Sequence, residues 1–354
     1  MPSDTKTYQE ETYIDNTIRL RGVLNTMPDF ARDYFRAIEP TTSTKTRISY
    51  AYDIRIFFQF LISQNPSLAK VGIPNLNVSV LDQLKPIDIE EYMEYLKLYD
   101  SPNDQTTITN GERGLKRKIS SLRSFYTYYY KRQAIETNPV QLVDMPKIHD
   151  KAIIRLDAGE TAALLDYIEH CGDQLTGQRK AYYEKTKLRD LAIVTLLLGT
   201  GIRVSECVGL DVEDIDFRNN GIRLIRKGGS EMVVYFGPEV EKALKDYLEA
   251  RKAISPLEGH EHALFYSTQR KRIGVQAVEN LVKKYARAIT TTKKITPHKL
   301  RSTYGTTLYQ ETGDIYLVAD VLGHKDVNTT KKHYAAMDDA RRRKAATAIR
   351  LRED

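Results

Sequence analysis

Cysteine is nearly absent from this chain of 354 residues. It occurs twice, at Cys171 and Cys207, with neither the spacing of metal ligands nor the density of a disulfide framework. No apolar run reaches the roughly 18 residues that span a bilayer, and the longest, around Leu191–Leu198, suits a buried helix. The first residues lack the apolar core of a signal peptide. These absences predict a cytoplasmic protein with two free thiols, no membrane segment and no bound metal.

The charge balance points to a polyanionic partner. Lys and Arg number 54 against 47 Asp and Glu, which gives a net charge of +7 and a pI near 9.0. Such an excess favours nucleic acid as the partner. Hydrophobic residues make up 41% of the chain, enough for packed cores, so wholesale disorder is excluded. The length predicts two domains.

Helical periodicity is clearest in the first half of the chain. Ile54, Phe57, Phe58 and Leu61 follow the i, i+3, i+4, i+7 spacing of one apolar face, which predicts a helix over 44–64. The polar residues before it supply N-cap candidates. Residues 1–40 are expected to form one or two short helices, and a further helix is expected over 87–99.

A two-faced helix is predicted over 114–133. Its apolar face comprises Ile119, Leu122, Phe125, Tyr126 and Tyr129. Its other face carries the basic residues Lys116, Arg117, Lys118 and Arg123. A basic face of this kind is either a solvated surface or a surface pressed against phosphates. The downstream motifs favour DNA contact by these four residues.

The second half combines helices with one hairpin. Pro146 and weak periodicity place a linker near 144–157. Helices are predicted over 158–171, 184–200, 238–253, 274–290, 298–311 and 314–322. A strand–turn–strand pattern with Gly228-Gly229 at the turn lies between them. The predicted fold is mainly α with a small β-sheet, in a helical domain over 1–147 and a second domain over 148–354.

Several residues of the second half suit the breaking of a phosphodiester by a side-chain oxygen. Arginine forks match the charge and geometry of a phosphate, a Lys or His can protonate the leaving oxygen, and a Tyr can form a covalent intermediate. Neither a metal nor another cofactor is required by this chemistry. The candidates, in chain order, are Arg203, Glu206, Lys227, His298, Arg301, His324 and Tyr334.

This order resembles the tyrosine recombinase family, whose pattern is Arg, an acidic residue, Lys, His-x-x-Arg, His or Trp, then Tyr. The likeness is carried by TGIRVSE, RKGG, TPHKLR and LGHKDVNTTKKHY over roughly 190–340. Within the family the chain most resembles Xer recombinases of the single-recombinase, XerS-like type. The stretch HYAAMDDARRRKAA is more similar to integrases of mobile elements, so the subfamily stays open.

The resemblance implies a role for each matched residue. Arg203 and Arg301 would clamp the scissile phosphate, and Lys227 would protonate the leaving 5′-oxygen. Tyr334 would attack the phosphorus and form a 3′-phosphotyrosyl bond.

The remaining matches would assist. His298 would aid proton transfer to or from Tyr334, His324 would hydrogen-bond the phosphate, and Glu206 would orient its neighbours. Tyr304 and Tyr309 are poor nucleophile candidates, because they belong to the helix that His298 begins.

The implied assembly is a homotetramer on two specific duplex DNA sites, with strands exchanged through a Holliday junction. The N-terminal domain would bind one face of the DNA and the catalytic domain the other, and the segment 338–354 would serve assembly. The task is either chromosome dimer resolution or integration and excision of a mobile element. A type IB topoisomerase-like enzyme and an inactive DNA-binding protein are the alternatives.

Three departures from the family pattern bear on the geometry of the site. Ten positions separate His324 from Tyr334, His333 precedes the tyrosine, and Ser302 follows the His-x-x-Arg motif.

Overall fold

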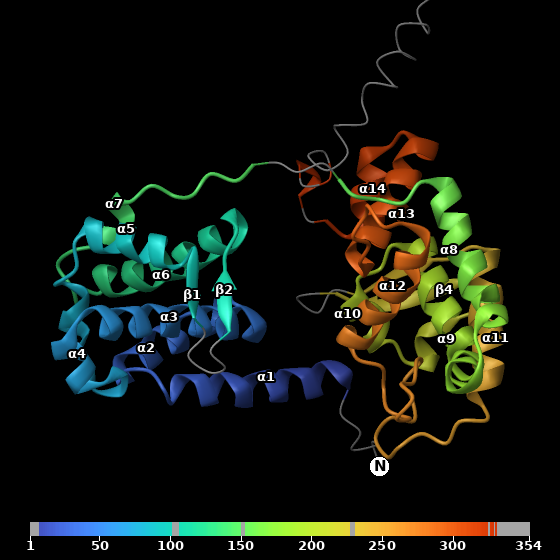
Figure 1. The fold of residues 1–354 in the computed structure, drawn as a ribbon, viewed down its shortest axis with the longest axis horizontal. Helices are drawn as coiled ribbons and strands as arrows, with labels where there is room; N and C mark the ends of the chain where they lie inside the picture. Colours follow the sequence, from blue (N-terminus) through green and yellow to red (C-terminus); the bar gives the residue numbers. More distant parts are fainter. Residues whose placement is uncertain are drawn as a thin grey trace, which may run out of the picture. The chain divides into compact units, whose positions relative to one another are not determined.

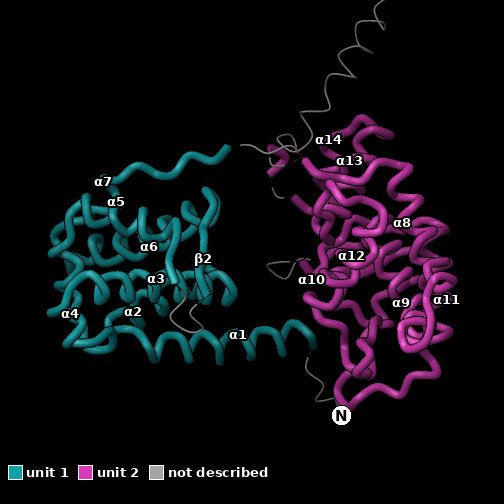
Figure 2. Tube along the Cα trace, viewed as in Figure 1, with its two compact units in different colours: residues 1–151 teal, residues 152–354 magenta. Residues whose placement is uncertain are grey.

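The chain forms two compact units, residues 1–151 and 152–354, in a computed structural model (Figures 1 and 2). We call them unit 1 and unit 2. The structure describes residues 7–100, 106–149, 153–226, 231–324, 326–328 and 330. The division falls four residues beyond the predicted domain boundary at 147. Among the described helices, none combines the length and the apolar character needed to cross a bilayer.

Unit 1 consists of helices and one short ladder of two antiparallel strands. The helices are α1 (Tyr8–Leu24), α2 (Asp29–Ala37), α3 (Thr44–Gln64), α4 (Pro66–Val71), α5 (Pro86–Tyr95), α6 (Glu112–Lys131) and α7 (Pro139–Leu142). The strands are β1 (Leu98–Asp100) and β2 (Thr107–Thr109). The helix predicted over 44–64 is confirmed with the same bounds, and the one predicted over 114–133 is found over 112–131.

Two expectations about unit 1 were wrong in detail. The first helix is longer than expected, since α1 spans 17 residues. The helix predicted over 87–99 ends at Tyr95, because the side chain of Asn110 donates to the Leu96 carbonyl at 2.7 Å and the chain then enters β1. A three-residue strand leaves too little alternation for its period to stand out in the sequence.

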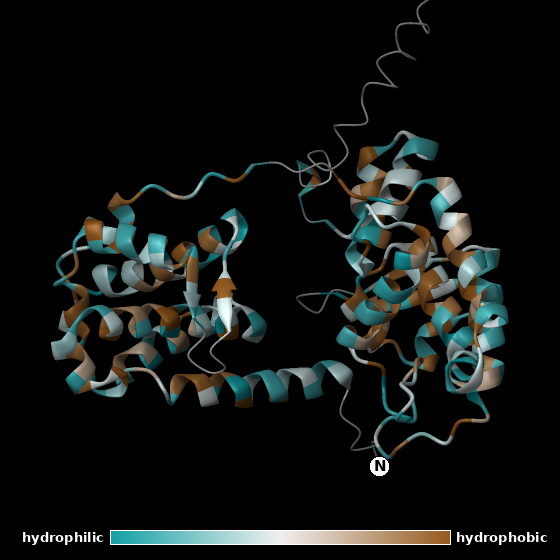
Figure 3. Ribbon diagram, in the orientation of Figure 1, coloured by the Kyte–Doolittle hydropathy of each residue, from teal (hydrophilic) through white to brown (hydrophobic). Residues whose placement is uncertain are grey.

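Aromatic side chains form the core of unit 1. The rings of Phe30, Phe58, Phe125 and Tyr129 pack edge to face or tilted, with Phe30 and Phe58 centroids 5.9 Å apart and Phe125 and Tyr129 centroids 5.0 Å apart. These pairs join the start of α2 to α3 and α6. The predicted apolar faces of α3 and α6 are fully or nearly fully buried. Figure 3 shows hydrophobic and hydrophilic stretches alternating along the helices of both units.

Unit 2 is built around one long helix. Its helices are α8 (Ala158–His170), α9 (Gly177–Thr200), α10 (Val204–Gly209), α11 (Pro238–Arg251), α12 (Val275–Ile289), α13 (Pro297–Thr312) and α14 (Ile315–Leu322). Helix α9 packs against α8, α10, α11, α12 and α13. Its apolar run is buried, as expected, although the helix begins seven residues before the predicted start at 184.

The predicted hairpin is an antiparallel sheet of order β3-β4-β5. Its strands are β3 (Ile215–Asp216), β4 (Gly221–Ile225) and β5 (Glu231–Tyr235). Ile222 pairs with Val234, and both are buried, which fixes the register of the hairpin. The turn glycines at 228 and 229 lie outside the described residues. The fold class is therefore mainly α with small antiparallel sheets, as predicted.

The most deeply buried ion pair of unit 1 joins α3 to α6. Asp53 is 1% exposed, and its carboxylate contacts Arg117 and Lys118, the latter at 3.3 Å. Burial raises the pKa of Asp53 and lowers the pKa of Lys118, and the charge of each group counteracts the shift of the other.

We predict that Asp53→Ala destabilises the chain by about 3–5 kcal/mol, because it leaves the buried Lys118 without its acid. Urea unfolding followed by circular dichroism measures this change, since the chain lacks Trp. Asp33→Ala is the matched control: its pair with Arg36 is exposed and should be worth about 1 kcal/mol or less. Equal costs for the two variants would contradict the prediction.

Candidate active site at the C-terminal turn of α14

Arg203 follows a turn that packs against a half-buried tyrosine, Tyr304. Gly201 ends α9 in the left-handed region, with φ at 63°. A Cβ at Gly201 would lie 2.3 Å from a ring carbon of Tyr304, so only glycine fits between this turn and α13. Burial raises the pKa of Tyr304, which agrees with its exclusion as a nucleophile.

Glu206 holds Arg203 by both its backbone and its side chain. One carboxylate oxygen accepts from the backbone N–H of Arg203 and the other from its Nη1, each at 2.7 Å. The Glu206 side chain is 8% exposed and the Arg203 side chain 40%. Arg203 is thus oriented by a buried acid while part of its guanidinium stays accessible. This geometry fits the orienting role expected of Glu206.

Helix α14 ends in a Schellman turn. Gly323 adopts φ 61° and ψ 48°, and the backbone N–H of His324 donates to the Ala319 carbonyl at 2.9 Å. Gly323 is therefore the left-handed cap of α14. Such a turn satisfies the carbonyls at 319 and 320 but leaves the next ones to find other partners.

Three arginines occupy the carbonyls that this turn leaves open. Each comes from a different part of unit 2: the start of α10, the end of β4 and the first turns of α13. The contacts are Arg226 Nη2 to the Val321 carbonyl (2.8 Å), Arg301 Nη2 to the Leu322 carbonyl, and Arg203 Nη2 to the Gly323 carbonyl (3.4 Å). The negative end of the helix dipole favours cations here.

Arg301 lies at the centre of this cluster. It is 4% exposed, and its Nη1 donates to the Gly201 carbonyl. Its Nη2 is 3.5 Å from Nε2 of His324, whose Nδ1 is 2.7 Å from Oγ1 of the buried Thr330. Arg203, Arg301 and His324 therefore converge on one turn, although more than 100 residues separate the first from the last.

The other predicted catalytic residues are His298, Lys227 and Tyr334. His298 is exposed in the first turn of α13, three positions before Arg301. Lys227 and Tyr334 lie outside the described residues, and so does the expected assembly segment 338–354. The roles of these residues stay predictions.

The four basic residues expected to contact DNA are not alike. Arg117 is exposed and Lys116 half-buried, whereas Lys118 is buried beside Asp53. Arg123 donates to the carbonyls of Val140 and Val143, so it fastens α7 to α6. Lys118 and Arg123 thus have structural partners within unit 1, and Arg117 also contacts Asp53. Of the four, Lys116 and Arg117 are the ones that reach the surface of α6.

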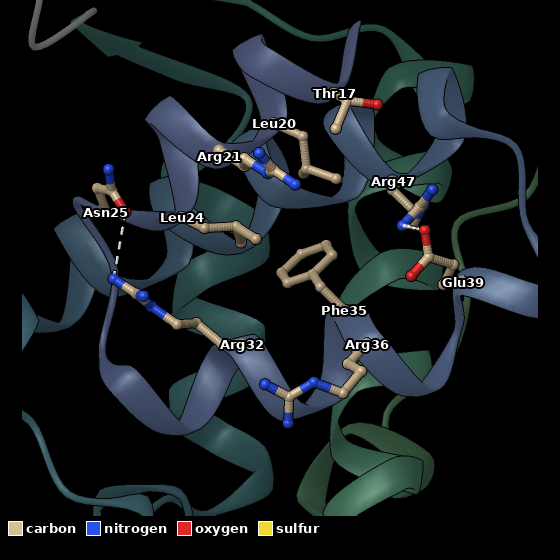
Figure 4. A pocket seen from close by; sticks show the side chains of 10 residues that line it. All are labelled: Thr17, Leu20, Arg21, Leu24, Asn25, Arg32, Phe35, Arg36, Glu39 and Arg47. Atoms are coloured by element: carbon tan, nitrogen blue, oxygen red, sulfur yellow. Dashed lines mark hydrogen bonds and ion pairs between the residues drawn. The ribbon is translucent and has the colours of Figure 1, made fainter. Parts of the chain in front are cut away.

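A basic pocket of about 340 Å³ lies in unit 1 between α1, α2 and the start of α3 (Figure 4). It is lined by Arg21, Arg32, Arg36 and Arg47, over an apolar floor that includes Leu20, Leu24 and Phe35. Arg47 pairs with Glu39 at 2.9 Å, and Arg32 donates to Asn25 at 3.2 Å. The pocket contains none of the predicted catalytic residues.

Sequence reasoning missed two residues of the cluster, Arg226 and Thr330. Arg226 directly precedes Lys227, and the family motif is matched by the lysine and not by the arginine. Thr330 is one of two adjacent threonines between His324 and Tyr334, and nothing in the motif distinguishes it from Thr329. The sequence does not reveal that a side chain bonds a backbone carbonyl, because a residue of any type can supply that carbonyl.

The chain is similar to known proteins over most of its length. Residues 155–341 match the phage integrase family. The chain is 32% identical to the tyrosine recombinase XerC of Caldanaerobacter subterraneus subsp. tengcongensis, over 91% of this chain and 86% of that protein. It is 30% identical to the tyrosine recombinase XerS of Streptococcus equi subsp. zooepidemicus, over 89% and 94%.

Solved structures show the same fold. A XerH site-specific recombinase, in a post-cleavage complex with a palindromic difH substrate, matches with a TM-score of 0.61 and 18% identity. The match covers 86% of this chain and 79% of that one.

The helical fold and the arginine–histidine cluster define a protein of the recombinase class. The chain belongs to the phage integrase family of tyrosine recombinases. The family and the enzyme class expected from the motifs are thereby confirmed.

We predict that Thr330→Val slows DNA cleavage about tenfold, because a hydrogen bond worth about 1 kcal/mol no longer selects the tautomer and orientation of the His324 ring. Single-turnover cleavage of a nicked duplex measures the rate. Thr161→Val removes a hydroxyl of α8 that donates to the carbonyl of Asp157, the N-cap of the same helix, and should leave the rate unchanged. A Thr330→Val rate equal to that of the control would show that the bond is dispensable.

Proposed function

We propose that the chain is a site-specific recombinase that cuts duplex DNA through a covalent bond to Tyr334 and rejoins it without a cofactor. The observation that carries the proposal is the convergence of Arg203, Arg301 and His324 on the C-terminal turn of α14. Two guanidiniums and an imidazole in one place suit the nonbridging oxygens of a phosphodiester. Covalent storage of the bond energy makes religation possible without ATP.

The reaction follows from these groups. The Tyr334 oxygen attacks phosphorus, the bond from phosphorus to the 5′-oxygen breaks, and Lys227 supplies the proton that this oxygen takes up. Arg203 and Arg301 stabilise the charge on the nonbridging oxygens, and His298 moves the proton of the tyrosine. The products are a 3′-phosphotyrosyl bond and a free 5′-hydroxyl, and religation is the reverse.

His324 and Glu206 complete the site. His324 would hydrogen-bond the same phosphate, and the 3.5 Å between its Nε2 and Nη2 of Arg301 supports this role. Glu206 neutralises part of the arginine charge and keeps Arg203 in one orientation.

Unit 1 would contribute binding to the DNA backbone. Lys116 and Arg117 on the surface of α6 are the groups most available for phosphate contact, with Lys118 and Arg123 holding that helix in place. We propose that four copies assemble on two sites and exchange strands through a Holliday junction, either to resolve chromosome dimers or to move a mobile element.

The nucleophile is the sharpest test. We predict that Tyr334→Phe abolishes covalent capture of a nicked duplex carrying the site that the protein selects from a random-sequence pool. Binding of the same duplex in a gel shift should not change, because only a hydroxyl is lost. Tyr309→Phe serves as the control and should still form the adduct. Persistent adducts with Tyr334→Phe on a denaturing gel would assign the attack to another residue.

The clamp arginine gives a second test. Arg301→Lys keeps a positive charge but loses the planar fork that reaches two carbonyls, so we predict cleavage about 100-fold slower or worse. Single-turnover rates on the selected duplex measure the change, and a gel shift measures binding. A cleavage rate within about threefold of wild type would show that Arg301 does not stabilise the transition state.

A further inference from the structure

Arg226 is the third arginine on the α14 turn, and the mechanism above does not use it. It is the residue that follows strand β4, and its side chain is 9% exposed. Its Nη2 donates to the Val321 carbonyl at 2.8 Å. A side chain so deeply covered is fastened to the turn and is not offered to a ligand.

The turn is shaped to receive this guanidinium. A Cβ on Gly323 would lie 1.2 Å from Nη1 of Arg226 and 2.2 Å from its Cζ. Gly323 therefore serves two purposes: it adopts the left-handed conformation of the helix cap, and it leaves the volume that the guanidinium fills. An arginine that merely lay against the surface would need no such space.

The charge of Arg226 is compensated both by the turn and by the carboxylate of Glu206. Its Nε has no hydrogen-bond partner in the described part of the chain, and the nearest carboxylate oxygen, Oε1 of Glu206, is 4.0 Å away. Burial, and then the neighbouring Arg203, lower the pKa of Arg226. An arginine nevertheless stays charged at neutral pH, so the helix carbonyls and Glu206 must stabilise it.

We propose that Arg226 is a positioning residue: it ties the end of β4 to the α14 turn, and the proton transfer by Lys227, the next residue in the chain, depends on that anchor. Consecutive Cα atoms are about 3.8 Å apart, so an anchor at 226 limits where the backbone of 227 can be. This inference rests on the proposed function, in which Lys227 protonates the leaving oxygen.

A substrate with sulfur in place of the bridging 5′-oxygen tests the inference, because a 5′-thiolate leaves without a proton. The selected nicked duplex is prepared in both forms, and single-turnover cleavage is measured with Lys227→Ala and Arg226→Ala. Lys227→Ala should be slowed about 100-fold or more on the oxygen substrate and be close to wild type on the sulfur substrate. Arg226→Ala should show the same selectivity, with slowing of about tenfold or more on oxygen.

Arg223→Ala is the matched control. Arg223 lies on the same strand, is 57% exposed and pairs with Asp214, so its loss should affect neither substrate. The ratio of two rates on one preparation does not depend on the folded fraction. If Arg226→Ala does not fold, Arg226→Lys, which keeps a cation at the site, is used instead. Its cleavage rates on the oxygen and sulfur substrates are compared in the same way.

The outcomes separate the two proposals. Equal slowing of the Arg226 variant on both substrates, or no slowing on either, would overturn the positioning role while Lys227→Ala still showed sulfur rescue. Equal slowing of Lys227→Ala on both substrates, or no adduct with the unmodified protein, would instead overturn the proposed proton transfer or the proposed reaction.

Discussion

The last turn of α14 is the constraint on which the site depends. A helix that ends must find partners for its final carbonyls, and here those of Val321, Leu322 and Gly323 each receive an arginine. The arginines come from three separate segments, so satisfying one helix end brings α10, β4 and α13 together. The backbone hydrogen-bond requirement, which every helix has, is used in this protein to assemble cationic groups at one point.

The resulting cluster brings three positive charges to one turn. Glu206 serves two of the guanidiniums, because its carboxylate bonds Arg203 and lies 4.0 Å from Arg226. Mutual repulsion among them is tolerated because the helix dipole and the carbonyls stabilise each one. An arriving phosphodiester relieves that repulsion, so the folded chain is prepared for an anion before it meets one. Such stored repulsion is typical of sites that give up some stability for function.

The sequence predicted the fold well where periodicity was long and poorly where elements were short. Both ends of helix α3 were predicted at the observed residues, because its apolar face repeats over five turns. The three-residue strands β1 and β2 were missed. The motif identified Arg203, Arg301 and His324, but it could not show that backbone carbonyls hold them. It also treated Lys118 and Arg123 as surface groups, because a charged residue looks the same in a sequence whether it meets water, Asp53 or a carbonyl.

The fit between Arg226 and Gly323 also constrains how this protein can change. Any side chain at 323 would need the space that the guanidinium fills, and any shorter residue at 226 would leave a hollow beneath the turn. The two positions are therefore free to vary only together, although about 100 residues separate them. In an evolutionary record of close relatives, this pair would appear as linked substitutions, and a lone change at either place would be rare.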